Sequence, residues 1–323
     1  MNVKMLESLT QSDNNTLRQS NVSTYQHKYT MFQQLDGKAL SLQIKEEIAN
    51  EVRQLTAQGY RPPHLAAVIV GNDGASQTYV ANKEKSSHEV GFISSVYRLP
   101  ENISEKELLQ TIDFLNNDNE IDGFIVQLPL PKHINEQHII NAISPDKDVD
   151  GFTAINVGRM VLGEEAFIPA TPMGICTLLK RYNVETAGKH CVVMGRSNIV
   201  GTPVANLLSR KGFDCTVTIC HSKTKNMADL TRQADILVVA IGKPEMVTAD
   251  MVKEGAVVID VGIHRIPDES KKSGYRIIGD VKHDEVDKLC SWVTPVPGGV
   301  GPLTIVSLLE NTMKAYKRQL KIK

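Results

Sequence analysis

A tyrosine and a lysine four residues apart are the first residues of this chain whose types and spacing could do chemistry. Tyr79 and Lys83 lie in the segment Ser76-Gln77-Thr78-Tyr79-Val80-Ala81-Asn82-Lys83, after the turn Gly71-Asn72-Asp73-Gly74. Ser76 is a candidate N-cap for a helix here, and that helix would put Tyr79 and Lys83 on one face. A phenol can hold a lysine near a reacting atom, and a partly neutral lysine can relay a proton. The alternative is an exposed helix with an ordinary Tyr–Lys contact.

Further polar groups follow two segments nearer the middle of the chain. The run Gly123-Phe124-Ile125-Val126-Gln127-Leu128-Pro129-Leu130-Pro131 predicts a strand that ends in an irregular turn, with a cis proline bond as one option. Gln127 would stand at the strand end, the edge at which open α/β sheets bind ligands. The turn Asp146-Lys147-Asp148-Val149-Asp150-Gly151 gathers three carboxylates. A helix cap is the simple explanation, and a metal site has no His or Cys nearby to support it.

Residues 191–208, CVVMGRSNIVGTPVANLL, have the order of a buried strand, a polar loop and a helix start. Gly195 opens the loop, Ser197 stands where a Rossmann fingerprint has its second glycine, and Gly201 comes one residue late. Three more apolar segments follow at alternating spacing, as in a doubly wound sheet. The helix N-terminus beside Ser197 offers N–H groups to a diphosphate, so the loop predicts a dinucleotide site.

The residues after the second strand of this unit indicate which dinucleotide binds. An NAD site has an acidic residue about 20 residues beyond the glycines, whereas here the strand runs into Cys220-His221-Ser222-Lys223-Thr224. With Arg196 in the loop, these groups suit a ribose phosphate, and we predict NADP. The alternative is that His221 and Lys223 only solvate the end of a strand.

Length and composition restrict the class of protein. A chain of 323 residues predicts two domains. A net charge of −1 gives no reason to expect a nucleic-acid or membrane partner, and no apolar run approaches the ~18 residues that span a bilayer. The five cysteines form no CxxC pair, so we expect a reduced, cytoplasmic protein.

The remaining pattern suggests how the chain divides. Residues 1–33 are polar and without apolar period, which predicts a disordered extension, with Met31 as a candidate start. We expect one α/β domain formed by 34–168 together with 303–323, and a Rossmann-like domain over 169–302, with a hinge at Pro169-Ala170-Thr171-Pro172. Residues 303–320 predict an amphipathic helix that returns to the first domain.

Several of these motifs, in this order, resemble the family of bifunctional methylenetetrahydrofolate dehydrogenase/methenyltetrahydrofolate cyclohydrolases, from about residue 34 to the C-terminus. The motifs are Tyr79-x-x-x-Lys83, Val126-Gln127-Leu128-Pro129-Leu130-Pro131, Asp148-Val149-Asp150-Gly151, Gly195-Arg196-Ser197-x-x-Val200-Gly201 and Pro295-Val296-Pro297-Gly298-Gly299-Val300-Gly301-Pro302.

The resemblance implies two α/β domains around a cleft and two reactions in it: NADP-dependent oxidation of methylenetetrahydrofolate, then hydrolysis of the methenyl product to formyltetrahydrofolate. No metal is required, and a homodimer through the nucleotide-binding domains is expected. By this resemblance the catalytic residues are Lys83, Tyr79 and Gln127, the folate contacts are Asp150, Ser76, Pro297, Gly298 and Gly299, and the dinucleotide contacts are Gly195, Arg196, Ser197, Gly201, His221 and Ser222.

Two other functions would fit parts of the pattern. A two-domain NADP enzyme of shikimate-dehydrogenase type would share the architecture, but it has no need of the Gln127 turn together with Asp150. A nucleotide-sensing protein without catalysis would be expected to lack the lysine or its partners, which are present.

Overall fold

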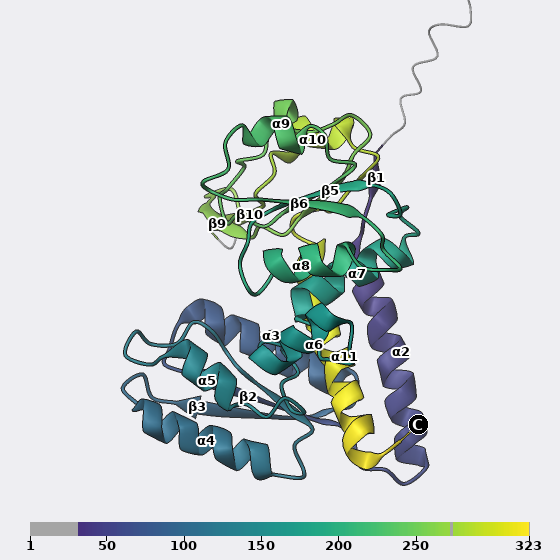
Figure 1. The fold of residues 1–323 in the computed structure, drawn as a ribbon. Helices are drawn as coiled ribbons and strands as arrows, with labels where there is room; N and C mark the ends of the chain where they lie inside the picture. The colour runs from purple at the N-terminus through teal and green to yellow at the C-terminus, as the bar shows by residue number, and fades with distance from the viewer. Residues whose placement is uncertain (1–31, 272–273, 323) are drawn as a thin grey trace, which may run out of the picture. The chain divides into compact units, whose positions relative to one another are not determined.

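The structure, a computed structural model, describes residues 32–271 and 274–322 as a mixed α/β fold with two parallel sheets (Figure 1). Most of the predicted extension therefore lies outside the described residues, while Gln33 already belongs to a strand. The smaller parallel sheet has the order β3-β2-β4, formed by Ile93–Leu99, His64–Val70 and Gly123–Val126. The larger has the order β1-β11-β8-β7-β5-β6, formed by Gln33–Gln34, Trp292–Val293, Val257–Asp260, Ile236–Val239, His190–Met194 and Thr216–Cys220. An antiparallel pair, β9 (His264–Pro267) and β10 (Tyr275–Ile278), stands apart from both.

Helices follow most strands and cover the sheets, as expected for parallel strands that need crossover connections. Their bounds are α2 Gly37–Ala57, α3 Gly74–Glu89, α4 Glu105–Asn117, α5 Glu136–Ala142, α6 Ala154–Leu162, α7 Ala170–Arg181, α8 Gly201–Leu208, α9 Met227–Thr231, α10 His283–Val286 and α11 Val300–Leu320, with short 3₁₀ turns at Ala249–Met251 and Asp287–Leu289. Strands β4, β7 and β8 are buried at every position. Continuous burial explains why their sequences are apolar runs rather than alternating patterns.

Two helices begin earlier than the sequence suggested. Ser76 was expected to cap α3, but the N-cap is Asp73, whose carboxylate accepts the N–H of Ser76 at 2.8 Å. Residues 170–172 were expected to form a hinge before a helix, but they are the first turn of α7. Pro172 fits there because the first turn of a helix does not use its N–H groups. The predictions that Ser76 is the cap and that the second helix begins only after Pro172 are therefore wrong.

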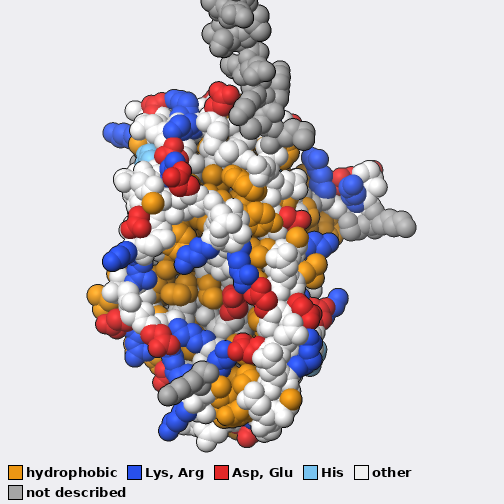
Figure 2. All heavy atoms as spheres, turned by 90° about the vertical axis from the view of Figure 1, so that its right-hand side faces the viewer, with side chains coloured by type: hydrophobic (Ala, Val, Ile, Leu, Met, Phe, Trp, Pro, Cys, Tyr) orange, Lys and Arg blue, Asp and Glu red, His pale blue; other side chains and the backbone are white. Residues whose placement is uncertain are grey.

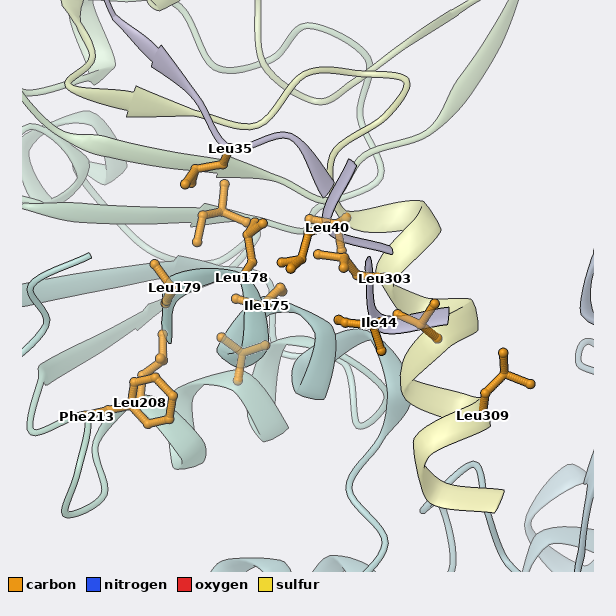
Figure 3. Packing of buried hydrophobic residues seen from close by; sticks show 14 of the residues in the cluster. Leu35, Leu40, Ile44, Ile175, Leu178, Leu179, Leu208, Phe213, Leu303 and Leu309 are labelled. Atoms are coloured by element: carbon orange, nitrogen blue, oxygen red, sulfur yellow. The ribbon is translucent and has the colours of Figure 1, made fainter. Parts of the chain in front are cut away.

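The C-terminal helix α11 lies against both halves of the fold. It begins at Val300 rather than Leu303 and packs against α7 and α2 and against α3, β2 and β4. Side chains of α2, α7, α8 and α11 share one buried cluster, which includes Leu40, Ile44, Ile175 and Leu303 (Figure 3). The return of this helix to the first sheet agrees with the sequence. The pairing of β1 with β11 in the other sheet was not anticipated.

The face of the molecule in Figure 2 carries charge of both signs. On the face shown in Figure 2, Lys and Arg side chains are interspersed with Asp and Glu, as suits a chain with a net charge of −1. No helix in the described ranges is long and apolar enough to cross a membrane. All five cysteines lie in those ranges and are free thiols.

Candidate active site

Lys83 is the central side chain of the site, and α3 buries it beside the end of β4. Its Nζ donates a hydrogen bond to Oε1 of Gln127 at 3.3 Å. The other end of that amide is fixed, because Nε2 of Gln127 donates to the carbonyl of Leu128 at 2.6 Å. The Leu128–Pro129 bond that follows is cis, the option left open by the sequence. The structure thus brings together a helix residue and a strand-end residue, as the motifs predicted.

Tyr79 lies one helical turn before Lys83 and covers its ammonium. The Nζ of Lys83 lies 5.7 Å from the centroid of the Tyr79 ring, within the range of a cation–π contact. Burial raises the pKa of the Tyr79 hydroxyl. The phenol therefore stays protonated at neutral pH and can act as a hydrogen-bond donor.

Asp150 lines the same cavity as Lys83. Burial raises the pKa of its carboxyl, the positive charge of Lys83 acts to lower that pKa, and the neighbouring Asp148 acts to raise it further. Asp148 itself is structural, because its carboxylate accepts the N–H groups of Phe152 and Thr153 at 3.1 and 2.8 Å. Of the three carboxylates in this turn, that of Asp148 therefore holds the backbone, and that of Asp150 is the one influenced by Lys83.

The cavity that holds these groups has a volume of about 190 Å³. It also contains residues that the sequence did not single out. Thr171 of α7 and Thr304 of α11 face each other with their hydroxyl oxygens 3.0 Å apart, and both line the cavity. Ile199, from the loop after β5, closes another side. These residues belong to elements far apart in the chain, so no local spacing marks them.

The loop after β5 is built around two glycines that cannot carry a side chain. A Cβ on Gly195, where φ is +122°, would lie 2.2 Å from the carbonyl oxygen of Ala240. A Cβ on Gly201 would lie 2.2 Å from the oxygen of Gly195. Ser197 stabilises the turn between them, because its hydroxyl accepts the N–H of Val200 at 3.1 Å. These contacts explain why residues 195 and 201 of this chain are glycines, whereas residue 197 between them can carry a hydroxyl side chain.

Arg196, His221 and Ser222 lie at one edge of the larger sheet. Strands β5 and β6 pair in parallel with Met194 opposite Cys220, so the residues that follow each strand meet at the same edge. Arg196 and Ser222 are exposed, and His221 is partly so. The Nδ1 of His221 accepts the N–H of Lys223 at 3.2 Å, which leaves Nε2 as the N–H donor. This edge therefore presents a guanidinium, an imidazole N–H and a hydroxyl to solvent.

A network of buried carboxylates fixes the ends of β7 and β8. Asp280 accepts the N–H groups of Ile241 and Gly242, both at 2.9 Å, and faces Nε2 of His264 at 2.7 Å. Asp260 accepts the N–H of Gly262 at 2.8 Å and faces Nε2 of His283 at 3.2 Å. The network holds the backbone that leads to Ile263, whose side chain is 52% exposed. The spacing of Asp260, Asp280, His264 and His283 in the sequence did not indicate this network.

Four of the five predicted folate contacts do not line the cavity around Lys83. Ser76 is buried in the first turns of α3. The turn of Pro297, Gly298 and Gly299 packs against the start of α2, where the N–H of Lys38 donates to the carbonyl of Gly298 at 2.8 Å. The Val296–Pro297 bond in that turn is cis.

Two larger cavities adjoin the first through shared residues. One, of about 290 Å³, shares Tyr79 with it and extends between α2, α3 and the start of α11. The other, of about 710 Å³, shares Leu128, Phe152 and Ile199 and reaches Ser197 and Asn198 of the loop after β5. Within residues 32–271 and 274–322, no cluster of three His, Cys, Asp or Glu side chains could hold a metal ion.

Two family models match the chain, and together they cover most of it. The model described as "Tetrahydrofolate dehydrogenase/cyclohydrolase, catalytic domain" matches residues 35–150. The model described as "Tetrahydrofolate dehydrogenase/cyclohydrolase, NAD(P)-binding domain" matches residues 169–320.

Individual relatives agree with these models. The bifunctional protein FolD of Porphyromonas gingivalis is 58% identical over 290 residues, which are 89% of this chain and 98% of that protein. The crystal structure of the bifunctional enzyme FolD from Campylobacter jejuni has a TM-score of 0.84 at 49% identity and covers 89% of this chain and 99% of its own. A FolD structure from Trypanosoma brucei, described as complexed with NADP cofactor and inhibitor, has a TM-score of 0.84 at 40% identity over 88% of this chain and 97% of its own.

Proposed function

The chain belongs to the tetrahydrofolate dehydrogenase/cyclohydrolase family, and on this premise we propose that the cavity around Lys83 carries both of its reactions. The protein oxidises 5,10-methylenetetrahydrofolate with NADP⁺ and hydrolyses the 5,10-methenyl product to 10-formyltetrahydrofolate. The alternatives of a shikimate-dehydrogenase type enzyme and of a non-catalytic nucleotide sensor receive no support from these matches.

The two reactions make different demands on the site. In the first, a hydride leaves the methylene carbon for C4 of the nicotinamide ring, and that carbon becomes the methenyl cation between N5 and N10. In the second, a water oxygen bonds to the same carbon, the bond from the carbon to N5 breaks, and N5 gains a proton while one proton is released. The first step needs a nucleotide beside the folate, and the second needs a group that moves protons.

In our proposal Lys83 moves those protons, and its neighbours keep it in place. Its amine takes a proton from the attacking water and returns one to N5. Gln127, at 3.3 Å, and the ring of Tyr79, at 5.7 Å, hold the Nζ within the cavity. Asp150 accepts hydrogen bonds from the amino edge of the pterin, and such charge-assisted bonds are the stronger kind. Ser76, Pro297, Gly298 and Gly299 stay predicted folate contacts.

NADP binds along the edge formed by the ends of β5 and β6. We assign the ribose phosphate to Arg196, His221 and Ser222, because they offer donors and a cation where an NAD site has a carboxylate. Gly195, Ser197 and Gly201 shape the loop whose N–H groups receive the diphosphate.

The observation that carries the proposal is that Ile199, from the dinucleotide loop, lines the same cavity as Lys83 and Asp150. A nicotinamide ring that enters past Ile199 would meet the folate beside the lysine. One cavity then serves both the hydride transfer and the hydrolysis.

The substitution Lys83→Gln tests this assignment. It should lower the hydrolysis of methenyltetrahydrofolate at least about 100-fold, the usual range for losing a general acid–base group, and leave NADP⁺ affinity nearly unchanged. The two steps are separated by following reduced nicotinamide and the methenyl species independently, with NADP⁺ binding measured by calorimetry. Lys85→Gln is the matched control, because Lys85 lies on the same helix but its side chain is 75% exposed. A Lys83→Gln enzyme that hydrolyses the methenyl compound at the normal rate would refute the role.

We also propose a cytoplasmic homodimer that assembles through the larger sheet. Strand β6 is at the edge of that sheet, with Ile219 exposed on it, and such an edge can pair with a second copy. The free thiols of all five cysteines suit a reducing compartment. Light scattering of the purified protein would give twice the chain mass of 35.6 kDa for a dimer, and the single mass would exclude it.

A further inference from the structure

A histidine outside the cavity around Lys83 joins two loops at one edge of the larger sheet. His264 is the first residue of β9, and its Nε2 lies 2.7 Å from Oδ1 of the buried Asp280. The other oxygen of that carboxylate accepts the N–H groups of Ile241 and Gly242, both at 2.9 Å. Because a carboxylate only accepts hydrogen bonds, the imidazole donates from Nε2. Removing this donor would leave a buried oxygen unsatisfied, which is costly, so Asp280 would have to move.

The β9–β10 hairpin is what brings His264 to Asp280. In this antiparallel pair His264 lies opposite Ile278, two residues before Asp280. The backbone of Gly262 approaches from the same side, since a Cβ added there would lie 2.4 Å from the backbone nitrogen of Asp280. Asp280 is therefore held by the loop that follows β8 and itself holds the loop that follows β7.

These two loops lie where a dinucleotide bound to β5 and β6 would continue. The sheet order β8-β7-β5-β6 places β7 beside β5, with β8 beyond it. Ala240 follows β7, and its N–H donates to the carbonyl of Met194 at 2.8 Å, while its own oxygen packs onto Gly195. With the ribose phosphate at the end of β6 and the diphosphate at the loop after β5, the nicotinamide half extends toward the ends of β7 and β8.

Ile263 connects the loop after β8 to the side of the first domain. It directly precedes His264, its side chain is 52% exposed, and it lines a cavity together with Tyr79. Tyr79 in turn lines the cavity around Lys83. The hydrogen bond of His264 therefore fixes backbone that lies between the nucleotide-binding edge and the reacting centre.

We propose that His264 is a positioning residue for the hydride transfer and has no part in the hydrolysis. Its hydrogen bond to Asp280 keeps the loops after β7 and β8 in the arrangement that receives the nicotinamide half of NADP. The inference rests on the proposed function, because it needs both reactions in one cavity. Hydride transfer depends on where the nicotinamide lies, since a displacement of about 1 Å can cost about 100-fold in rate. The hydrolysis needs Lys83 and water but no nucleotide.

The test compares His264→Leu, which removes the donor, with His264→Gln, whose amide N–H groups can replace it. Three quantities are measured: kcat and KM for NADP⁺ in the oxidation, the hydrolysis of supplied methenyltetrahydrofolate without nucleotide, and the affinity for adenosine 2′,5′-bisphosphate, the adenosine half of NADP. In His264→Leu, kcat/KM for NADP⁺ should fall at least about 10-fold, with kcat itself lowered. The hydrolysis and the affinity for the bisphosphate should stay unchanged. His264→Gln should recover most of the lost oxidation.

Arg265→Gln is the matched control, because Arg265 is the next residue of β9 and its guanidinium lies 5.0 Å from the centroid of the Tyr275 ring on β10. The change alters the hairpin but keeps the donor of His264, so all three quantities should stay at their wild-type values.

Three results would overturn the role of His264 alone. They are unchanged NADP⁺ kinetics in His264→Leu, a parallel loss of hydrolysis and of bisphosphate affinity in that variant, and a His264→Gln enzyme as impaired as His264→Leu. A wild-type protein that reduces no NADP⁺ with methylenetetrahydrofolate would overturn the proposed function as well.

Discussion

We predict that this protein loses stability as the pH rises through about 9, because folding holds His283 in its cationic form. The imidazole lies between two carboxylates, with Nδ1 at 2.7 Å from Asp287 and Nε2 at 3.2 Å from the buried Asp260. Burial acts to lower the pKa of His283, but the hydrogen bonds and charges of Asp260 and Asp287 outweigh burial and raise that pKa to about 9.

The size of the effect follows from the difference between this pKa and the ordinary value of 6.5. A pKa raised by folding stabilises the folded state fully below the unfolded value, and the gain disappears as the pH passes the folded value. The difference corresponds to about 3 kcal/mol of unfolding free energy. Because the side chain of His283 is 23% exposed, solvent weakens the interaction and this figure is an upper value.

Urea unfolding of the wild type and of His283→Gln, at several pH values from about 6 to 9.5, measures this contribution. Other groups titrate in the same range, so the informative quantity is the difference in unfolding free energy between the two proteins. That difference should shrink by up to about 3 kcal/mol across the range, with most of the loss between pH 6.5 and 9. His138→Gln, which removes an exposed histidine paired with Glu105, should leave the profile unchanged. A wild-type minus His283→Gln difference that stays constant with pH would refute the reasoning.

Two further predictions concern Gly195, in the loop after β5, and the buried Asp150. Gly195→Ala should lower the free energy of unfolding, measured by urea titration, by about 3 kcal/mol and weaken NADP⁺ binding, because the added Cβ would overlap the carbonyl oxygen of Ala240. Gly188→Ala is the control, because Gly188 also has a positive φ but has no atom within 4 Å of the added Cβ. It should lower the free energy of unfolding by only about 1 kcal/mol. The KM for methylenetetrahydrofolate should rise as the pH falls toward the pKa of Asp150, which burial raises above the ordinary 3.8. In Asp150→Asn the KM should be high and flat over the same pH range, and a wild-type KM independent of pH would count against the assignment.

The sequence was informative wherever a local pattern positions the residue. Tyr79 and Lys83 share a face because a helix repeats at that spacing, and Gln127 stands at a strand end because an apolar run stops at prolines. The order of strand, loop and helix around Gly195 predicted the Rossmann-like sheet for the same reason.

The residues that could not be predicted depend on contacts between distant segments. Thr171 meets Thr304 across 133 positions, and Lys45 meets Ser86 across 41. The start of α3 was misplaced because Ser and Asp are both good caps, and only the backbone geometry decides between Ser76 and Asp73. The contact of His283 with Asp260 joins residues 23 positions apart, so no local sequence pattern predicts it.

The pairing of β1 with β11 and the return of α11 to β2 and β4 have a consequence for how this chain could be divided or recombined. A cut between the two regions matched by the family models would leave the N-terminal fragment with a strand that belongs to the other sheet, and would remove the helix that covers its own. Each fragment would expose apolar surface that the other buries. Neither half could then be exchanged with that of another enzyme as one continuous segment. The units that could be exchanged are the complete larger sheet, which includes β1, and the smaller sheet together with α11.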